Sequence, residues 1–234
     1  MLSFIYNGVS SQELGIMVNK ISHHDILSEE RIEKESYRNI HGSVYSKLNT
    51  FETYTLDVEC TLFENFNRDQ ISIIKSVFKN REAELIINNK PNNILKVRLI
   101  STVNFEKLFA STGKFLLSFE VHPFSYLKSG QTWIAVTSGS NLKNEGNYKS
   151  LPLFRITGSG KCSITINGNT MDFSNVNKQF IVDTELEDIY GIDGENLNNF
   201  MNIESDFVGF NENNNYITFT GITKLEVMSR WCEI

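Results

Sequence analysis

Hydrophobic and polar residues alternate along several stretches of the chain, as they do in a β-strand with one buried and one solvated face. Between residues 54 and 62, five apolar side chains alternate with threonine, aspartate and glutamate. The same two-residue period recurs over residues 95–99 and 115–121. Because antiparallel sheets commonly have one wet face, this pattern predicts a largely antiparallel β structure.

One segment has a helical period instead. The apolar residues of 71–78 recur three and four positions apart, which places them on one face of a helix. Asn67 and Gln70 resemble a capping box at its start, and Asn80 is suited to end it. We therefore expect a single helix that packs by one face on the sheet.

The second half of the chain contains short strands separated by turn signals. Residues 164–171 hold an Asn-Gly dipeptide between two apolar stretches, the strongest short-range signal for a β-hairpin. Residues 133–136 form a short apolar run among glycine- and serine-rich turns. A junction near residues 124–131 would separate an N-terminal domain, 1–127, from a C-terminal domain, 128–234. The spacing of the later strands predicts a sandwich of two packed sheets.

Length and composition agree with a mainly β protein, in which a barrel- or sandwich-like first domain carries the one helix. The 234 residues exceed one ordinary domain but fit two domains or one large β domain. A hydrophobic content of 40% is enough for packed cores and excludes general disorder. No apolar stretch approaches the roughly 18 residues of a membrane-spanning helix, and the first eight residues are too short and uncharged for a signal peptide. We expect a soluble protein with no membrane partner.

The net charge of −6 belongs to the C-terminal part of the chain. Residues 1–130 carry 15 basic and 15 acidic side chains, whereas the remainder carries 7 basic and 13 acidic. Specific nucleic-acid binding relies on clustered lysine and arginine that displace counterions from phosphates. An acidic domain therefore argues against a nucleic-acid partner.

Two short motifs could suggest ligand chemistry. The run Gly158–Lys161 resembles the end of a phosphate-binding loop, but Arg155 stands where such a loop needs its first glycine and Cys162 stands where it needs serine or threonine. We expect a β-turn there. His23 and His24 are adjacent, so on an extended chain they point to opposite faces, and a solvated loop is favoured over a metal site.

The remaining candidates are acidic residues and cysteines. The acidic run of residues 183–195 is interpreted first as a charged exposed face. A calcium site and a carboxylate pair for glycoside hydrolysis are the alternatives, although the run lacks the ligand order of a known calcium loop. Cys60 and Cys162 alternate with polar residues in apolar strands and are expected to be small buried hydrophobes. We predict no catalytic residue, no cofactor and no metal.

Several phrases, taken in order, resemble the distal tail protein (Dit) family of long-tailed phages with non-contractile tails. The similarity covers nearly the whole chain, and each phrase marks turns and strands rather than chemistry. Residues 39–43 depart from the family, because many relatives have a Pro-Gly-Arg-Asp-Gly turn there and only Gly42 is kept. In the first half, the phrases are the opening Phe4–Ser11 with Leu14–Ile16, and then the helix followed by Ala83–Ile87, Leu95–Ile100 and Phe115–Tyr126. In the second half, they are Gly146–Pro152, Ile156–Gly160, Ile166–Gly168, Ile181–Glu185, and the closing Gly221-Ile222 with Trp231.

The resemblance implies a non-enzymatic structural protein of a phage or prophage. It implies that six copies form a ring through their N-terminal domains at the tail tip, or baseplate, after synthesis in the host cytoplasm. It further implies that the C-terminal domain is a galectin-like sandwich. The implied partners are further copies of the chain, the tail tube protein, a tail-associated or tail fibre protein, and receptor-binding proteins.

A carbohydrate-binding β-sandwich that contacts the host surface is the alternative function. Such a site needs an aromatic platform flanked by polar side chains, and Trp133 and Trp231 are the candidates. Both positions are also explained as the ends of core strands. A cell-wall hydrolase is the least favoured interpretation, because no spacing in the chain forms a catalytic signature.

Overall fold

The computed structural model describes residues 2–22, 28–39, 41–63, 68–101 and 113–234. The chain divides into two compact units, which we call unit 1 and unit 2. Unit 1 comprises residues 1–125 with Ile234, and unit 2 comprises residues 126–233. Strands make up most of the described chain, which confirms the mainly β prediction.

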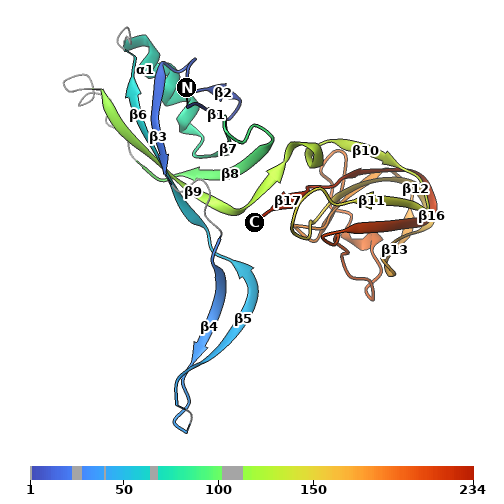
Figure 1. Ribbon diagram of the computed structural model, residues 1–234. Helices are drawn as coiled ribbons and strands as arrows, with labels where there is room; N and C mark the ends of the chain where they lie inside the picture. The colour runs from blue at the N-terminus through green and yellow to red at the C-terminus, as the bar shows by residue number, and fades with distance from the viewer. Residues whose placement is uncertain (1, 23–27, 40, 64–67, 102–112) are drawn as a thin grey trace. The chain divides into compact units, whose positions relative to one another are not determined.

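Unit 1 is built on one curled antiparallel sheet (Figure 1). The order of its strands is β2-β1-β7-β8-β9-β6-β3. The predicted strands at 54–62, 95–99 and 115–121 correspond to β6, β8 and β9. The bounds are β1 (Phe4–Tyr6), β2 (Val9–Ser10), β3 (Ile16–Ser22), β6 (Tyr54–Leu62), β7 (Glu82–Ile87), β8 (Asn93–Leu99) and β9 (Lys114–Leu127).

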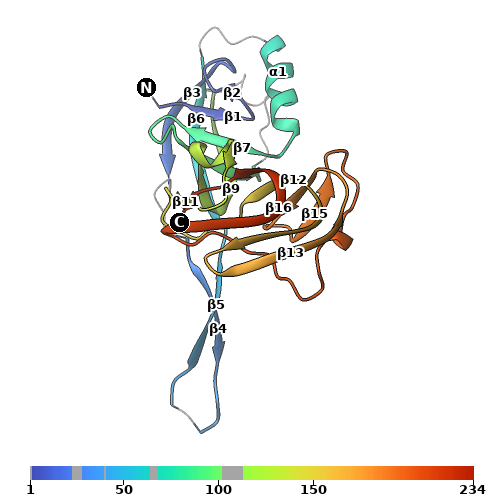
Figure 2. The same ribbon diagram turned by 90° about the vertical axis from the view of Figure 1, so that its right-hand side faces the viewer.

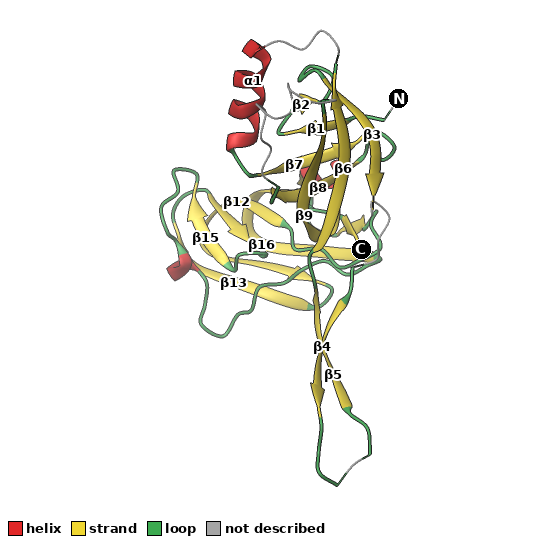
Figure 3. Cartoon of the chain, turned by 90° about the vertical axis from the view of Figure 1, so that its left-hand side faces the viewer, coloured by secondary structure: helices red, strands yellow, loops and turns green. Residues whose placement is uncertain are grey.

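The inner face of this sheet and one helix form the core of unit 1. Helix α1 (Arg68–Lys79) packs beside the sheet (Figure 3) and buries Ile74 completely. Its Phe78 ring lies 4.8 Å from the ring of Tyr6, measured between centroids. The hydroxyl of Tyr6 donates a hydrogen bond to the carbonyl oxygen of Asn80 at 2.7 Å, just beyond the last turn. The predicted helix is confirmed, and its predicted cap Asn67 lies outside the described residues.

A separate two-stranded sheet also belongs to unit 1. It consists of β4 (Glu30–Glu35) and β5 (Val44–Phe51), which pair with each other and with no other described strand. Figure 2 shows them as a long ribbon with a terminal loop. Nothing in the alternation pattern predicted this hairpin, because its hydrophobic residues do not face a core.

Unit 2 is a sheet of seven strands, in the order β10-β16-β12-β14-β15, with β11 on β16 and β13 on β12. Two short 3-10 helices, η1 (Lys128–Gln131) and η2 (Asn198–Phe200), complete its regular structure. A further short strand, β17 (Cys232–Glu233), lies near the end of the chain. The seven strands are β10 (Trp133–Val136), β11 (Ser140–Lys143), β12 (Leu153–Ile166), β13 (Asn169–Val176), β14 (Phe180–Asp183), β15 (Asp188–Gly191) and β16 (Asn214–Met228).

The sheet of unit 2 is folded into two layers, and two long strands, β12 and β16, run through both of them. The first part of β12, residues 153–156, pairs with β14, and its last part, residues 162–166, pairs with β13. Because β16 stays paired with β12 on both sides of the bend, the continuous sheet folds back on itself. Phe173 of β13 and Phe180 of β14 meet across the resulting core, with ring centroids 5.3 Å apart.

Glycines make the bend possible. The pairing of β12 with β16 is irregular between Gly158 and Ser163, where the two strands change layer. Gly221 has φ +70, and a Cβ built on it would lie 2.1 Å from the carbonyl oxygen of Lys161. The predicted β-turn at Gly158–Lys161 is therefore wrong, since these residues form a bulge inside a continuous strand.

The predicted hairpin at residues 164–171 is confirmed. It joins β12 to β13 through Asn167 and Gly168, whose φ values are 52 and 91. Two successive positive φ angles are the requirement of the type I′ turn that Asn-Gly favours.

We expect Gly221→Ala to destabilise unit 2 by about 3 kcal/mol, because the new Cβ meets backbone and φ is positive. The matched control is Gly160→Ala, where φ is +73 but nothing lies within 4 Å, and a cost of about 1–2 kcal/mol is expected. Both tryptophans lie in unit 2, so urea unfolding followed by tryptophan fluorescence measures this unit. Equal costs for the two variants would contradict the close approach.

Candidate functional site

The structure brings no catalytic constellation together among the described residues. No group of three or more histidine, cysteine, aspartate or glutamate side chains there could hold a metal ion. The three cysteines, Cys60, Cys162 and Cys232, are free and buried. Burial raises the pKa of Cys60 to about 12, so its reactive thiolate form is suppressed at neutral pH. The remaining candidate sites are exposed surfaces of the described residues.

The first surface is the exposed hairpin, which we define as β4 and β5 with their connecting loop. Its hydrophobic side chains do not pack on a core: Ile32 is 53% exposed and Tyr45 is 57% exposed. The ribbon itself is held by cross-strand contacts, such as the ammonium of Lys34 lying 5.9 Å from the centre of the Tyr45 ring. An isolated two-stranded hairpin is marginally stable in water, so this one gains stability wherever another surface covers it.

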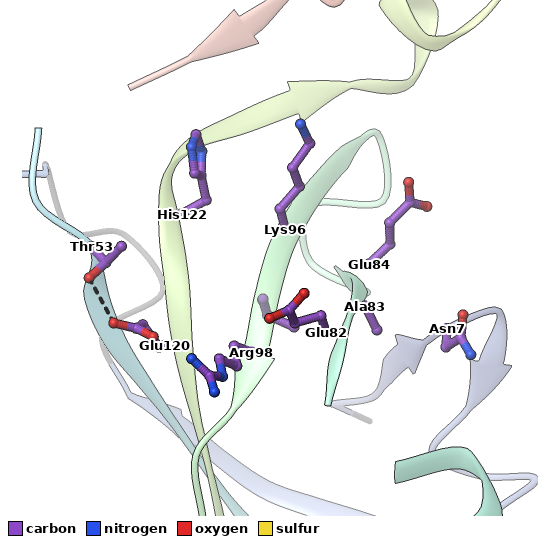
Figure 4. A pocket seen from close by; sticks show the side chains of 10 residues that line it. Asn7, Thr53, Glu82, Ala83, Glu84, Lys96, Arg98, Glu120 and His122 are labelled. Atoms are coloured by element: carbon purple, nitrogen blue, oxygen red, sulfur yellow. Dashed lines mark hydrogen bonds between the residues drawn. The ribbon is translucent and has the colours of Figure 1, made fainter. Parts of the chain in front are cut away.

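The second surface is a charged groove on the outer face of the unit 1 sheet (Figure 4). It is an open hollow of about 550 Å³ lined by side chains of β7, β8 and β9. The alternation along each strand sends core residues inward, so the intervening polar residues share the outer face. The charged groove is lined by Glu82, Glu84, Lys96, Arg98, Glu120 and His122, together with Asn7, Thr53, Ala83 and Val97.

Opposite charges face each other within the charged groove. The register of β7 and β8 places Glu82 opposite Arg98, and Glu84 opposite Lys96. Figure 4 shows Arg98 between Glu82 and Glu120, and the hydroxyl of Thr53 donates a hydrogen bond to Glu120 at 3.2 Å. This face can bind polar or charged groups, and it contains no nucleophile aligned with a base.

The acidic run of residues 183–195 does not form one charged exposed face. Asp183, with a side chain only 3% exposed, makes two bonds to the guanidinium of Arg230, at 2.7 and 3.0 Å. Glu185 lies 3.2 Å from the same guanidinium. Asp188 accepts a hydrogen bond from the side-chain amide of Asn198 at 2.7 Å. The exposed-face prediction is therefore wrong for Asp183, whose carboxylate is buried by its pairing with an arginine forty-seven positions later.

Arg230 ties together the segments where the chain enters and leaves unit 2. Its backbone N–H donates to the carbonyl oxygen of Gly130 at 2.8 Å, and its guanidinium donates to that of Leu151 at 3.3 Å. The adjacent Trp231 carbonyl accepts a hydrogen bond from the N–H of Leu127 at 2.8 Å. Sequence alone offered no signal for this cluster, because its members are far apart along the chain.

Arg230 also sets the protonation of Asp183. Burial by itself would raise the pKa of this carboxyl, but the hydrogen bonds and positive charge of Arg230 outweigh burial and hold the pKa below its ordinary value. The carboxyl is therefore ionised at neutral pH, and the pair is a structural one.

The two candidate sugar platforms lie in different surroundings. Trp231 is 5% exposed and lies 5.3 Å from the Phe210 ring, so a sugar has no open ring face to stack on. Trp133 is partly exposed, and the guanidinium of Arg155 lies 4.1 Å from the centre of its ring. Arg155 in turn reaches Glu226 at 3.5 Å. The predicted loop at His23 and His24 lies outside the described residues.

Comparison with known proteins gives one informative result. No family model matches the sequence, and no curated protein matches it. A solved structure does match: the crystal structure of the SPP1 Dit (gp 19.1) protein, with a TM-score of 0.71 over 97% of both chains and 15% sequence identity. The chain has the fold of a Dit protein. SPP1 Dit is described as a paradigm of the hub adsorption apparatus in phages that infect Gram-positive bacteria.

Within the described part of the chain, no helix is both long enough and apolar enough to cross a lipid bilayer.

We expect Arg230→Met to destabilise unit 2 by about 3 kcal/mol, because it leaves the buried Asp183 carboxylate without its partner. The matched control is Lys178→Met, which removes the exposed ion pair with Glu195 and should cost much less, because solvent screens an exposed pair. Tryptophan fluorescence during urea unfolding measures both. Similar small losses would show that the buried pair contributes little.

The low pKa of Asp183 also predicts a pH dependence. A carboxyl with a depressed folded-state pKa stabilises the fold above its unfolded value of 3.8, and this contribution is lost as the pH falls further through the folded pKa. The thermal midpoint of unit 2 should thus fall below about pH 3.8, and Asp183→Asn should flatten that fall while lowering the midpoint at neutral pH. Parallel pH curves for the two proteins would contradict this assignment.

Proposed function

We propose that this protein is a non-catalytic structural subunit of a phage or prophage tail tip. The observation that carries the proposal is the match to SPP1 Dit, which extends over 97% of both chains and so includes both units. The ordered sequence phrases that resemble the Dit family support the same role independently of the structure. The subunit joins the tail tube to the host-adhesion device, at the baseplate of the virion.

In the proposed assembly, six copies close into a ring through unit 1. The exposed hairpin supports this arrangement, because Ile32 and Tyr45 lose exposed apolar surface only if another molecule covers them. A contact between two different surfaces of identical subunits forms a closed ring when the rotations from one subunit to the next add up to a full turn. Residues 1–130 carry balanced charge, so neighbouring copies of this part do not repel one another strongly.

Unit 2 is then available to other tail proteins. Its acidic surplus keeps it solvated, and its partners in this proposal are a tail fibre or receptor-binding protein. The Trp231 ring is buried beside Phe210, and the Arg155 guanidinium lies over the Trp133 ring, so the proposal does not include carbohydrate binding.

We expect the purified chain to form a particle of six times the 26.8 kDa chain mass, and the double variant Ile32→Ser, Tyr45→Ser to shift it to monomer. Light scattering coupled to gel filtration measures the mass, and negative-stain images show whether a ring is present. Leu186→Ser is the matched control, because Leu186 is an exposed hydrophobic residue of unit 2.

A ring that persists in the double variant would exclude the exposed hairpin as the joint between subunits. If the wild-type chain stays monomeric and phage tails that contain it show no ring, the proposed function itself fails. A monomer in solution with a ring in assembled tails would instead show that tail partners drive closure.

A further inference from the structure

One layer of unit 2 consists of the strands β10-β16-β12-β14-β15. Its two edge strands, β15 and β10, differ in whether their outer side is hydrogen-bonded. At one edge, β15 is covered by the segment that follows it. The N–H of Gly191 donates to the carbonyl oxygen of Glu195, and the N–H of Leu197 donates to that of Ile189, each at 2.8 Å. The N–H of Ile189 also donates to the side-chain oxygen of Asn198 at 2.6 Å. The chain thus closes this edge with its own hydrogen bonds.

The opposite edge, β10, is open. It pairs with β16 on one side, and no described strand pairs with its other side. Ile134 is 40% exposed, and Ala135 beside it is also exposed. The strand Trp133–Val136 contains no charged residue and no proline, and its register with β16 has no bulge. Proteins usually protect an exposed strand edge with one of these devices or by keeping the edge strand very short, and β10, with four residues, has only its short length.

Other edges of the described chain carry such protection. In unit 1, β3 has a register shift between Val18 and Lys20 and places the Lys20 charge on the edge. The exposed hairpin carries a charged residue at almost every position of β4. In unit 2, β11 continues the edge that β10 begins, and it ends in Lys143. Among the edge strands of unit 2, β10 is the one with no charged residue, no proline and no bulge.

Trp133 gives this edge a fixed shape. Its register partner on β16 is Met228, and the Arg155 guanidinium lies 4.1 Å from the centre of its ring. Glu226, which is the register partner of Ala135, holds Arg155 at 3.5 Å. A row of side chains on β10, β16 and β12 thus orders the Trp133 ring, so little conformational freedom remains to be lost on binding.

We propose that β10 accepts an extended segment of a different polypeptide, which adds to the sheet as a further antiparallel strand. In strand addition, backbone hydrogen bonds supply affinity and alternate side chains supply specificity. The incoming segment needs uncharged residues along β10, with an apolar side chain that covers Ile134.

Charge selects the partner. Residues 131–234 carry 13 acidic against 7 basic side chains, so a second copy would bring the same negative surplus to the contact. A neutral strand with basic flanks has no such conflict. The inference refines the docking role of unit 2 in the proposed function, and it does not depend on ring closure.

The test uses the full chain and a short fluorescent peptide of alternating valine and threonine with a lysine at each end. We expect saturable binding by fluorescence anisotropy, and slower amide hydrogen exchange confined to residues 133–136 and their neighbours. Ala135→Lys should weaken binding by at least about tenfold, or 1.4 kcal/mol, through repulsion of the basic peptide at the edge.

Two controls separate this effect from unfolding and from general charge. Leu186→Lys adds the same charge at an exposed position away from β10 and should leave affinity within about twofold. The same peptide with a central proline should not bind, because proline cannot complete the ladder. Ala135→Lys should retain the wild-type unfolding midpoint, because Ala135 is exposed.

Absence of binding, or equal binding by Ala135→Lys, would overturn the proposal. A concentration-dependent dimer that Ala135→Lys abolishes would also overturn it, in favour of a second copy as the occupant. The hairpin variant Ile32→Ser, Tyr45→Ser should bind the peptide like the wild type. If the ring is absent but the peptide still binds at β10, the proposed ring fails and the docking edge stands.

Discussion

The structure of unit 2 depends on the continuous pairing of β12 with β16 through the bend between its two layers. Both strands pass through the bend side by side, so their backbones approach closely there. Backbone N–H and C=O groups at the bend need hydrogen-bond partners, and the close approach leaves no room for a side chain. Gly221 meets this requirement, since its φ is +70 and the Lys161 carbonyl occupies the place of a Cβ. The bend brings Phe173 and Phe180 together across the core.

The same pairing determines which surfaces remain open. Since β16 receives β10 and β11 one after the other, a single strand supplies the partner for the whole edge that they form. Residues 195–198 cover the opposite edge with hydrogen bonds, so β10 is the open edge of this layer. The buried Arg230–Asp183 pair holds together the segments where the chain enters and leaves unit 2. A domain held rigid in this way can present an edge without opening its own core.

In the proposed role, the two units offer surfaces for different kinds of contact. The exposed hairpin of unit 1 carries apolar residues that need a cover, which suits a permanent contact between subunits. Unit 2 is acidic and offers a strand edge, which suits the capture of a different chain. The charged groove, with Arg98 between Glu82 and Glu120, is compensated internally and adds polar surface without a strong net field.

Local patterns of residues were enough to predict the local structure. The alternation at 54–62, the helical period at 71–78 and the Asn-Gly turn at 167–168 each specify an element through nearest neighbours, and each is present. Features that depend on distant partners could not be predicted in this way, because they form only when the chain folds. Glycines 158 and 160 became a bulge rather than a turn because β16 follows β12 through the bend, and Asp183 became buried because Arg230 meets it. The open edge of β10 belongs to the same class, since a strand becomes an edge through the sheet order, which no local pattern of residues encodes.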